Sequence, residues 1–135
     1  MRKFKEQIIL VSGQMIPNVT PVMDSRYRPE KVTLCASDKM TKHTEILSNF
    51  FQGKGIAVEV FPLGDALEYA SLQKQFLELA VQKFSERDSI AVNLTGGTKL
   101  MTLAAMPAFD TAQIYAFYVT ERNTAVPILT GTEPS

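Results

Sequence analysis

The sequence predicts an α/β fold with three layers, in which a mainly parallel sheet of about six strands is covered by helices on both faces. Short apolar runs alternate along the chain with longer stretches of helical period. That alternation is typical of the strand, helix and strand crossovers that build a parallel sheet. The last two apolar runs are separated only by a short polar turn, which predicts an antiparallel hairpin at the C-terminal end.

The first half of the chain contains three predicted strands. Residues 8–11 form the first, and a short helix is expected over residues 20–25 before the second strand at residues 32–36. Residues 56–61 alternate between apolar and polar positions, which favours a strand near a sheet edge.

The helix between the second and third strands begins at a polar cap. We expect Ser37 or Asp38 to provide this cap. Its spacing predicts one apolar face made of Met40, Leu47, Phe50 and Phe51.

The second half of the chain begins with its longest predicted helix. Asp65 and Glu68 have the spacing of a capping box. Repeats of three and four residues predict that the helix buries Tyr69, Leu72, Phe76, Leu77, Ala80 and Phe84.

Three further strands complete the predicted sheet. Residues 89–94 form the fourth strand, and Pro107 is expected to end or kink the helix that follows it. Residues 114–119 are apolar on both faces, as in a well-covered strand. Residues 125–129 are expected to return as an antiparallel edge strand. Pro127 is tolerated there because an edge strand does not need every backbone N–H for pairing.

A phosphate-binding turn is predicted at Thr95, Gly96, Gly97, Thr98 and Lys99, between the fourth strand and its helix. Glycines allow the backbone to turn sharply and approach a ligand. The Thr98 hydroxyl is expected to cap the helix, whose N-terminal amides and dipole favour an anion. Lys99 adds a positive charge. The same turn is also compatible with a purely structural role in which Lys99 is solvated.

A second polar loop follows the first predicted strand. It contains Ser12, Gly13, Gln14, Pro17 and Asn18. If the first and fourth strands are neighbours, both loops lie at the carboxyl edge of the sheet, where parallel sheets bind ligands. Ser37 and Asp38, after the second strand, are then expected at the rim of this site.

Several other functions are disfavoured by the sequence. Thr98 separates Gly97 from Lys99, unlike in a Walker loop, and only Gly13 follows the first strand where a dinucleotide fingerprint needs three glycines. We expect no metal and no other cofactor, because one histidine, one cysteine and scattered acids form no ligand pattern. Cys35 lies in an apolar run and His43 lies inside a helix, so both are expected to be packed residues or, for His43, a surface residue.

Length and charge limit the partners. With 135 residues, the chain is expected to form one domain over residues 1–135. Fourteen basic residues match fourteen acidic ones, which argues against general binding to duplex nucleic acid. The N-terminus has only four consecutive apolar residues, so we expect no membrane span and no signal peptide. A lone cysteine fits a cytoplasmic location.

Four segments of the chain, taken in order, resemble a CARF domain, the CRISPR-associated Rossmann-fold sensor. The resemblance is based on residues 9–14 with Pro17 and Asn18, residues 28–32, residues 92–101 and residues 116–119. The resemblance is greatest to the branch whose members carry a C-terminal restriction-endonuclease-like nuclease, a domain that residues 1–135 do not contain.

This resemblance implies a homodimer that binds a cyclic oligoadenylate of type III CRISPR immunity, often the tetra-adenylate, and controls a fused or separate effector nuclease. The loop at residues 12–18 would form one wall of the site and residues 95–99 the other. Two alternatives remain open. Some CARF domains are metal-independent ring nucleases, for which Ser12 and Lys99 would be the catalytic residues. The motif is also compatible with a general nucleotide-binding fold.

Overall fold

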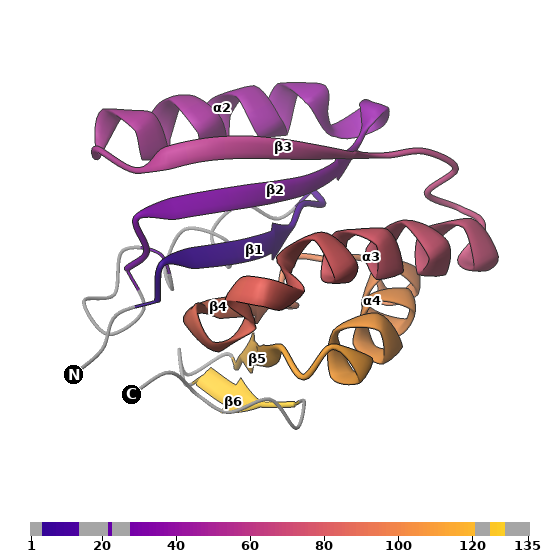
Figure 1. The fold of residues 1–135 in the computed structure, drawn as a ribbon. Helices are drawn as coiled ribbons and strands as arrows, with labels where there is room; N and C mark the ends of the chain where they lie inside the picture. The colour runs from indigo at the N-terminus through magenta and orange to yellow at the C-terminus, as the bar shows by residue number, and fades with distance from the viewer. Residues whose placement is uncertain (1–3, 14–21, 23–27, 121–124, 129–135) are drawn as a thin grey trace.

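A computed structural model describes residues 4–13, 22, 28–120 and 125–128 of the chain. These residues form one sheet in the order β3-β2-β1-β4-β5-β6 (Figure 1). The first five strands pair in parallel, and β6 is antiparallel to β5. The strands are β1 (Glu6–Leu10), β2 (Lys31–Ser37), β3 (Ala57–Leu63), β4 (Ile90–Asn93), β5 (Tyr115–Val119) and β6 (Ala125–Pro127). The predicted α/β class, parallel sheet, edge strand β3 and C-terminal hairpin are therefore confirmed.

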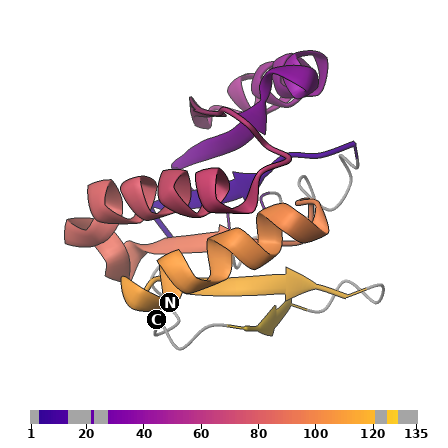
Figure 2. The ribbon, with the colours of Figure 1, turned by 90° about the vertical axis from the view of Figure 1, so that its right-hand side faces the viewer.

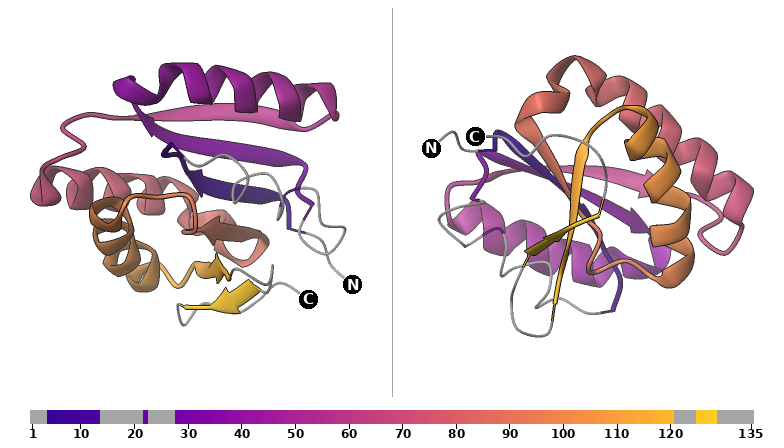
Figure 3. Two further views of the ribbon diagram at one scale, coloured as in Figure 1. Left: turned by 180° about the vertical axis from the view of Figure 1, so that it is seen from behind. Right: turned by 90° about the horizontal axis from the view of Figure 1, so that it is seen from below.

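Helices form the two outer layers. One face of the sheet carries α2 (Thr41–Gly53), which continues directly from the 3-10 helix η1 (Asp38–Met40). The other face carries α3 (Tyr69–Lys83) and α4 (Lys99–Thr111), with the 3-10 helix η2 (Phe84–Ser89) after α3. Figures 2 and 3 show these helices on opposite sides of the strands. In the part of the chain that the structure describes, no helix is long and apolar enough to cross a membrane. The helix expected over residues 20–25 lies outside the described residues.

Alternate side chains of β1 belong to two of the three core clusters that the described residues form. Ile8 and Leu10 face α3 and α4, whereas Ile9 faces α2. In the larger cluster, the rings of Phe76 and Phe109 join α3 to α4 with centroids 6.1 Å apart. Every residue of β1 is buried, because the strand lies in the middle of the sheet with helices on both faces.

The predicted role of Cys35 as a core residue is confirmed. The thiol is completely buried on the face that carries α3 and α4, and this burial raises its pKa above the ordinary value. A thiol that stays protonated is a poor nucleophile.

Two predicted helix caps are wrong. Asp65 and Glu68 form no capping box: α3 begins without a side-chain cap, and Asp65 instead adopts a left-handed turn with φ 47°. The backbone carbonyl of Asp65 accepts a bond from the Glu68 amide at 2.9 Å, so a turn replaces the cap. Neither Ser37 nor Asp38 caps the helix with its side chain, because the chain enters α2 through the 3-10 helix η1.

Pro107 does not end α4, which continues to Thr111.

The predicted apolar stripe of α3 is partly wrong. Leu72, Phe76 and Ala80 are buried, but Tyr69 and Leu77 are exposed, and Phe84 lies beyond the helix in η2, exposed as well. The periodicity defined an apolar sector wider than the surface that the sheet and α4 cover. On α2, Leu47 and Phe51 are buried as predicted, Met40 packs partly buried in η1, and Phe50 is exposed.

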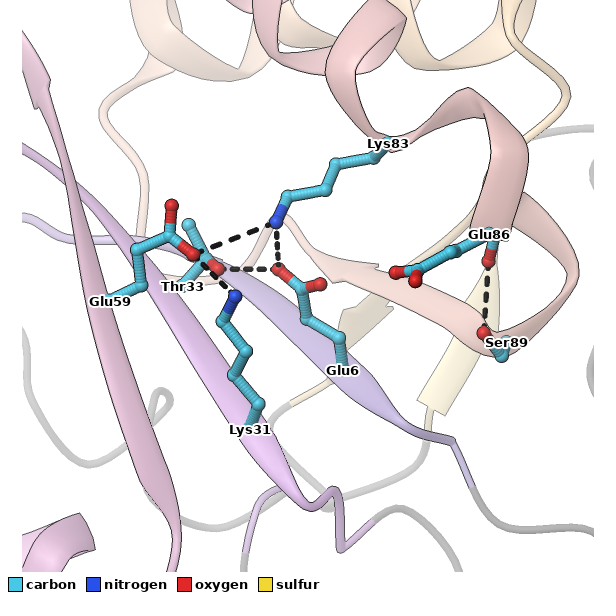
Figure 4. A network of polar contacts seen from close by, with 7 residues as sticks. All are labelled: Glu6, Lys31, Thr33, Glu59, Lys83, Glu86 and Ser89. Atoms are coloured by element: carbon cyan, nitrogen blue, oxygen red, sulfur yellow. Dashed lines mark hydrogen bonds and ion pairs between the residues drawn. The ribbon is translucent and has the colours of Figure 1, made fainter.

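A network of charged side chains lies at the amino edge of the sheet (Figure 4). Lys83 Nζ at the end of α3 is 3.1 Å from Glu6 Oε2 and 3.7 Å from Glu59 Oε2. The Thr33 hydroxyl donates to the Glu6 carboxylate, and Lys31 pairs with Glu59. The hydrogen bond from Lys31 lowers the pKa of Glu59, and the same bond raises the pKa of Lys31. The network ties the end of α3 to three strands.

Replacing Lys83 by alanine is expected to reduce the free energy of unfolding by about 3 kcal/mol, because the buried Glu6 carboxylate loses its cation. Urea denaturation measures the change. Lys74→Ala, at an exposed cation of the same helix, is the matched control and should change the free energy by less than about 0.5 kcal/mol. Equal losses in both variants would show that the network contributes nothing specific.

Candidate functional site at the carboxyl edge

Two loops with polar side chains follow neighbouring strands. β1 pairs with β4 in parallel, with Ile9 opposite Asn93, so the expected neighbourhood of these strands is confirmed. Ser12 and Gly13 follow β1, and the loop of residues 95–99 follows β4 at the same edge. Ser12 is half-buried and Gly13 is exposed. Gln14, Pro17 and Asn18, which belong to the same predicted wall, lie outside the described residues.

Thr95 fixes the start of the second loop. Its hydroxyl accepts a bond from the Val119 amide of β5 at 2.7 Å, and its own amide donates to the Asn93 side chain at 3.0 Å. The Leu94 amide donates to the Phe117 carbonyl at 3.0 Å, which extends the pairing with β5. The Thr95 hydroxyl therefore serves as a structural anchor between two strand ends.

Gly97 lies where the loop passes over the end of β1. A Cβ atom at this position would be 2.8 Å from Leu10 Cδ1 and 3.1 Å from both Leu10 Cβ and Thr102 Oγ1. A separation under 3 Å is a clash, so this backbone approaches β1 more closely than any other residue would allow. The glycine is required for packing against Leu10, and the loop is held tightly over the strand that carries Ser12.

The predicted cap of the next helix is confirmed. Thr98 has an extended backbone, with φ −66° and ψ 164°, and its hydroxyl accepts a bond from the Met101 amide at 3.1 Å. The first amides of a helix have no acceptor within the helix. The Thr98 hydroxyl accepts only from the Met101 amide, so the amides of Lys99 and Leu100 are donors without an acceptor among the described residues.

Lys99 supplies the charge at this end of α4. Its side chain is exposed and forms no ion pair with any other residue that the structure describes. Amide donors, the positive end of the helix dipole and an ammonium group thus occur together within one turn. This arrangement suits an anion such as a phosphate.

Ser37 and Asp38 lie further along the edge, at the end of β2. They line a groove of about 670 Å³ between α2 and the end of β3. The described lining includes Glu45 and Asp65 but none of residues 95–99. The end of β2 is two strand spacings from that of β4, roughly 10 Å. The carboxylates of this groove disfavour phosphate, and a rim role for Ser37 and Asp38 remains a prediction.

Two supporting residues were missed in the sequence. Asn93 and Val119 hold Thr95 from two different strands, yet neither was a predicted site residue. The sequence does show that Asn93 is a polar residue in an otherwise apolar strand, which could have indicated a structural role. In the structure Asn93 is completely buried. The Val119 amide gave none, because a backbone donor has no signature in the sequence.

The fold and the paired loops define the class of doubly wound α/β proteins, in which ligand sites occur at the carboxyl edge of the parallel sheet. The family model named Card1 CARF domain matches residues 7–133, almost the whole chain. The chain belongs to this family. The predicted CARF resemblance and the Rossmann-like topology are therefore confirmed.

Solved structures with the same fold are longer than this chain. Protein VC1899 from Vibrio cholerae superposes with a TM-score of 0.84 and 16% sequence identity over 91% of this chain and 33% of that one. Can2 from Sulfobacillus thermosulfidooxidans, in complex with cyclic tetra-adenylate, superposes with a TM-score of 0.76 and 20% sequence identity. The match covers 98% of this chain and 38% of Can2. A type III CRISPR defence DNA nuclease activated by cyclic oligoadenylate superposes with a TM-score of 0.70 and 21% sequence identity. The match covers 87% of this chain and 19% of the nuclease. The chain thus spans less than two fifths of the length of each. A search of curated proteins finds no match.

Replacing Gly97 by alanine is expected to destabilise the protein by about 1 to 3 kcal/mol, because the new methyl group meets Leu10 at the packed edge of the sheet. Thermal or urea unfolding measures the effect. Gly13→Ala is the matched control, since a Cβ there meets nothing within 4 Å. The close-approach role of Gly97 would be refuted if both variants were as stable as the wild type.

Proposed function

We propose that this domain binds a cyclic oligoadenylate and acts as a sensor in type III CRISPR immunity. The observation that carries the proposal is the loop at residues 95–99, where uncapped amides of α4 and the exposed ammonium of Lys99 adjoin the loop that follows β1. Membership of the CARF family supports this ligand class, and so do two similar structures, one in complex with cyclic tetra-adenylate and one of a nuclease activated by cyclic oligoadenylate.

A homodimer is part of the proposal because of the symmetry of the ligand. A ring of four identical nucleotides has a two-fold axis, so two copies of one site contact it equivalently across an isologous dimer. Each copy then neutralises about two phosphates, which a helix N-terminus and one lysine can accomplish. The balanced charge of the chain is consistent with this demand.

We further infer that the domain regulates an effector nuclease, fused to it or separate, as in the nuclease-bearing branch of the family. The similar structures are about two and a half to five times as long as the part that this chain matches. Residues 1–135 would form one ligand-binding unit of such a protein in the cytoplasm, where a lone buried thiol such as that of Cys35 stays reduced.

Lys99→Ala is expected to weaken binding of the ring by about 1.5 to 3 kcal/mol, roughly a 10- to 150-fold rise in Kd, because a charge-assisted phosphate contact is lost. Isothermal calorimetry with cyclic tri-, tetra- and hexa-adenylate measures both affinity and stoichiometry. We expect one ring for two chains and the highest affinity for the tetra-adenylate.

Lys5→Ala is the control for this experiment. Lys5 is an exposed cation at the opposite, amino edge of the sheet, so its removal changes net charge equally but touches no part of the site. An equal loss of affinity in both variants would indicate a general charge effect. No binding of any ring by the folded wild-type protein would refute the sensor function, and preference for a mononucleotide would indicate a general nucleotide-binding fold.

A ring nuclease is the second candidate. It is favoured by Lys99, whose free ammonium lies in the loop beside the one that carries the Ser12 hydroxyl. In such a reaction a ribose 2′-hydroxyl loses its proton and attacks the adjacent phosphate, and the bond from phosphorus to the 5′-oxygen of the next nucleotide breaks. That oxygen takes up a proton, so the ring opens to a linear product with a 2′,3′-cyclic phosphate and a 5′-hydroxyl, while the protein aligns the groups and stabilises the developing charge. Radiolabelled ring incubated with excess protein in EDTA should yield a linear product that Lys99→Ala no longer forms. Intact ring under these single-turnover conditions would reject the activity.

A further inference from the structure

A row of exposed side chains follows the outer surface of α2. Lys42, Ile46 and Phe50 are spaced four residues apart, and Lys54, directly after the helix, continues the same spacing. Ile46 is 49% exposed and Phe50 is 37% exposed, so the row is turned away from the sheet, whereas Leu47 of the same helix is buried. Among the described elements, α2 is the outermost on its face of the sheet (Figure 1). We call these four exposed residues the outer row.

The outer row and the residues beside it carry positive charge that the fold does not use. Lys42 and Lys54 are exposed, and so are Lys39 in η1 and Arg28. None of these four cations forms an ion pair with another residue that the structure describes. The Arg28 guanidinium donates to the Lys54 carbonyl at 2.9 Å, which holds a second cation at the end of the row. Residues 46–54 contain no acidic side chain. An anionic partner therefore complements this surface.

Phe50 adds an aromatic ring with a defined orientation to the row. It meets the buried ring of Phe51 edge to face, with centroids 5.7 Å apart and an interplanar angle of 70°. The ammonium group of Lys54 lies 5.6 Å from the centroid of the Phe50 ring. One nucleotide can thus place its phosphate at the ammonium and its base against the ring. Cations that follow the backbone and aromatic rings that stack on bases are the two components of surfaces that bind single-stranded nucleic acid.

The size of the row favours a single strand over a protein partner. From residue 42 to residue 54 it extends about 18 Å along the helix axis, which is long enough for several nucleotides. Its two partly exposed apolar side chains are too small a centre for a stable protein interface, which buries about 800 Å² on each partner. The groove on the other flank of α2 is lined by Asp38, Glu45 and Asp65, whose carboxylates repel an anionic strand. A bound strand would therefore follow the row and not the groove.

We propose that the outer row binds single-stranded RNA, with the four cations at its phosphates and Phe50 against a base. Asn49 is exposed beside the row, three residues after Ile46, and its amide suits the ribose 2′-hydroxyl, the group that distinguishes RNA from DNA. One helix surface is sufficient for a short single strand, although the chain as a whole is neutral. The row and α4 lie on opposite faces of the sheet, so this binding is independent of the ring proposed for the carboxyl edge (Figure 2).

Fluorescence anisotropy with a labelled oligouridylate of about twelve nucleotides tests the phosphate contacts. Between about 50 and 200 mM salt, we expect the logarithm of the binding constant to fall against that of the salt concentration with a slope of about −2.8, because each of four phosphate contacts contributes about −0.7. Lys42→Ala should make the slope shallower by about 0.7, since one contact is lost. Lys74→Ala, at an exposed lysine of α3, is the matched control and should leave the slope unchanged.

Phe50→Leu tests the stacking contact, because leucine keeps the apolar packing on Phe51 and removes the aromatic face. We expect RNA to bind about 5-fold more weakly or worse. Phe84→Leu is the matched control. Phe84 is 45% exposed in η2, which follows α3, and it also lies beside a cation, with the Arg87 guanidinium 4.1 Å from its ring centroid. This variant should bind RNA as the wild type does, and circular dichroism confirms that each variant is folded.

The proposal is overturned if the wild type binds no oligouridylate, if both control variants lose as much affinity as Lys42→Ala and Phe50→Leu, or if the corresponding deoxyribose strand binds equally well. Displacement of the RNA by polyglutamate of equal charge would indicate an acidic protein partner instead, and displacement by cyclic tetra-adenylate would place the strand at the carboxyl edge. Either displacement would overturn the outer row as an RNA site.

Calorimetry of the ring with the same proteins is a separate measurement. A wild type that binds the ring but no RNA would refute the role of the outer row and leave the proposed sensor function intact. A wild type that binds RNA but no ring would do the reverse. The two failures are thus distinguishable.

Discussion

The close contact between the loop after β4 and the end of β1 is the constraint on which the site depends. Gly97 can lie against Leu10 only because it has no side chain, and this contact places the start of α4 directly beside the end of the neighbouring strand. Moving the loop outward by the width of a methyl group would separate the uncapped amides of α4 from the residues after β1. A packing requirement inside the protein thereby sets the geometry of the candidate anion site.

Rigidity of the loop is obtained from bonds to the sheet. Thr95 is held by Asn93 of its own strand and by the Val119 amide of the next, and the carbonyl of Leu94 accepts from the Gly97 amide at 3.3 Å. Two of the three polar side chains between residues 95 and 99 are thus engaged in the fold, since Thr98 caps α4. Lys99 alone keeps its polar group available. An anion at this site would meet a preorganised set of amides and one adaptable charge, which limits the entropy lost on binding.

Much of this fold was predictable because its signals are local. The buried strands are continuous apolar runs, and Thr98 follows its strand at the position of a helix cap, so the sheet, the hairpin and the main loop could be inferred from sequence. Apart from two helix caps, the predictions that were wrong concern how widely each helix is covered. Helical periodicity distinguishes an apolar sector from a polar one, but it does not tell whether a neighbour packs against all of that sector, and Leu77 is apolar yet exposed. The separation of Ser37 and Asp38 from residues 95–99 follows from strand order and the shape of the groove, neither of which is written in a short motif.

The two edges of the sheet have different physical characters, because the ion pairs among the described residues lie at the amino edge. At the amino edge, Lys83 joins the end of α3 to Glu6 and Glu59, so a displacement there would separate partly buried charges. At the carboxyl edge, α3 begins without a side-chain cap and Leu67 before it is largely exposed. The ion pairs that the described residues form therefore join the last turn of α3 to the sheet and not its first turn. An anion bound beside α4 would therefore act at the end of the helix pair that no ion pair among the described residues fixes to the sheet.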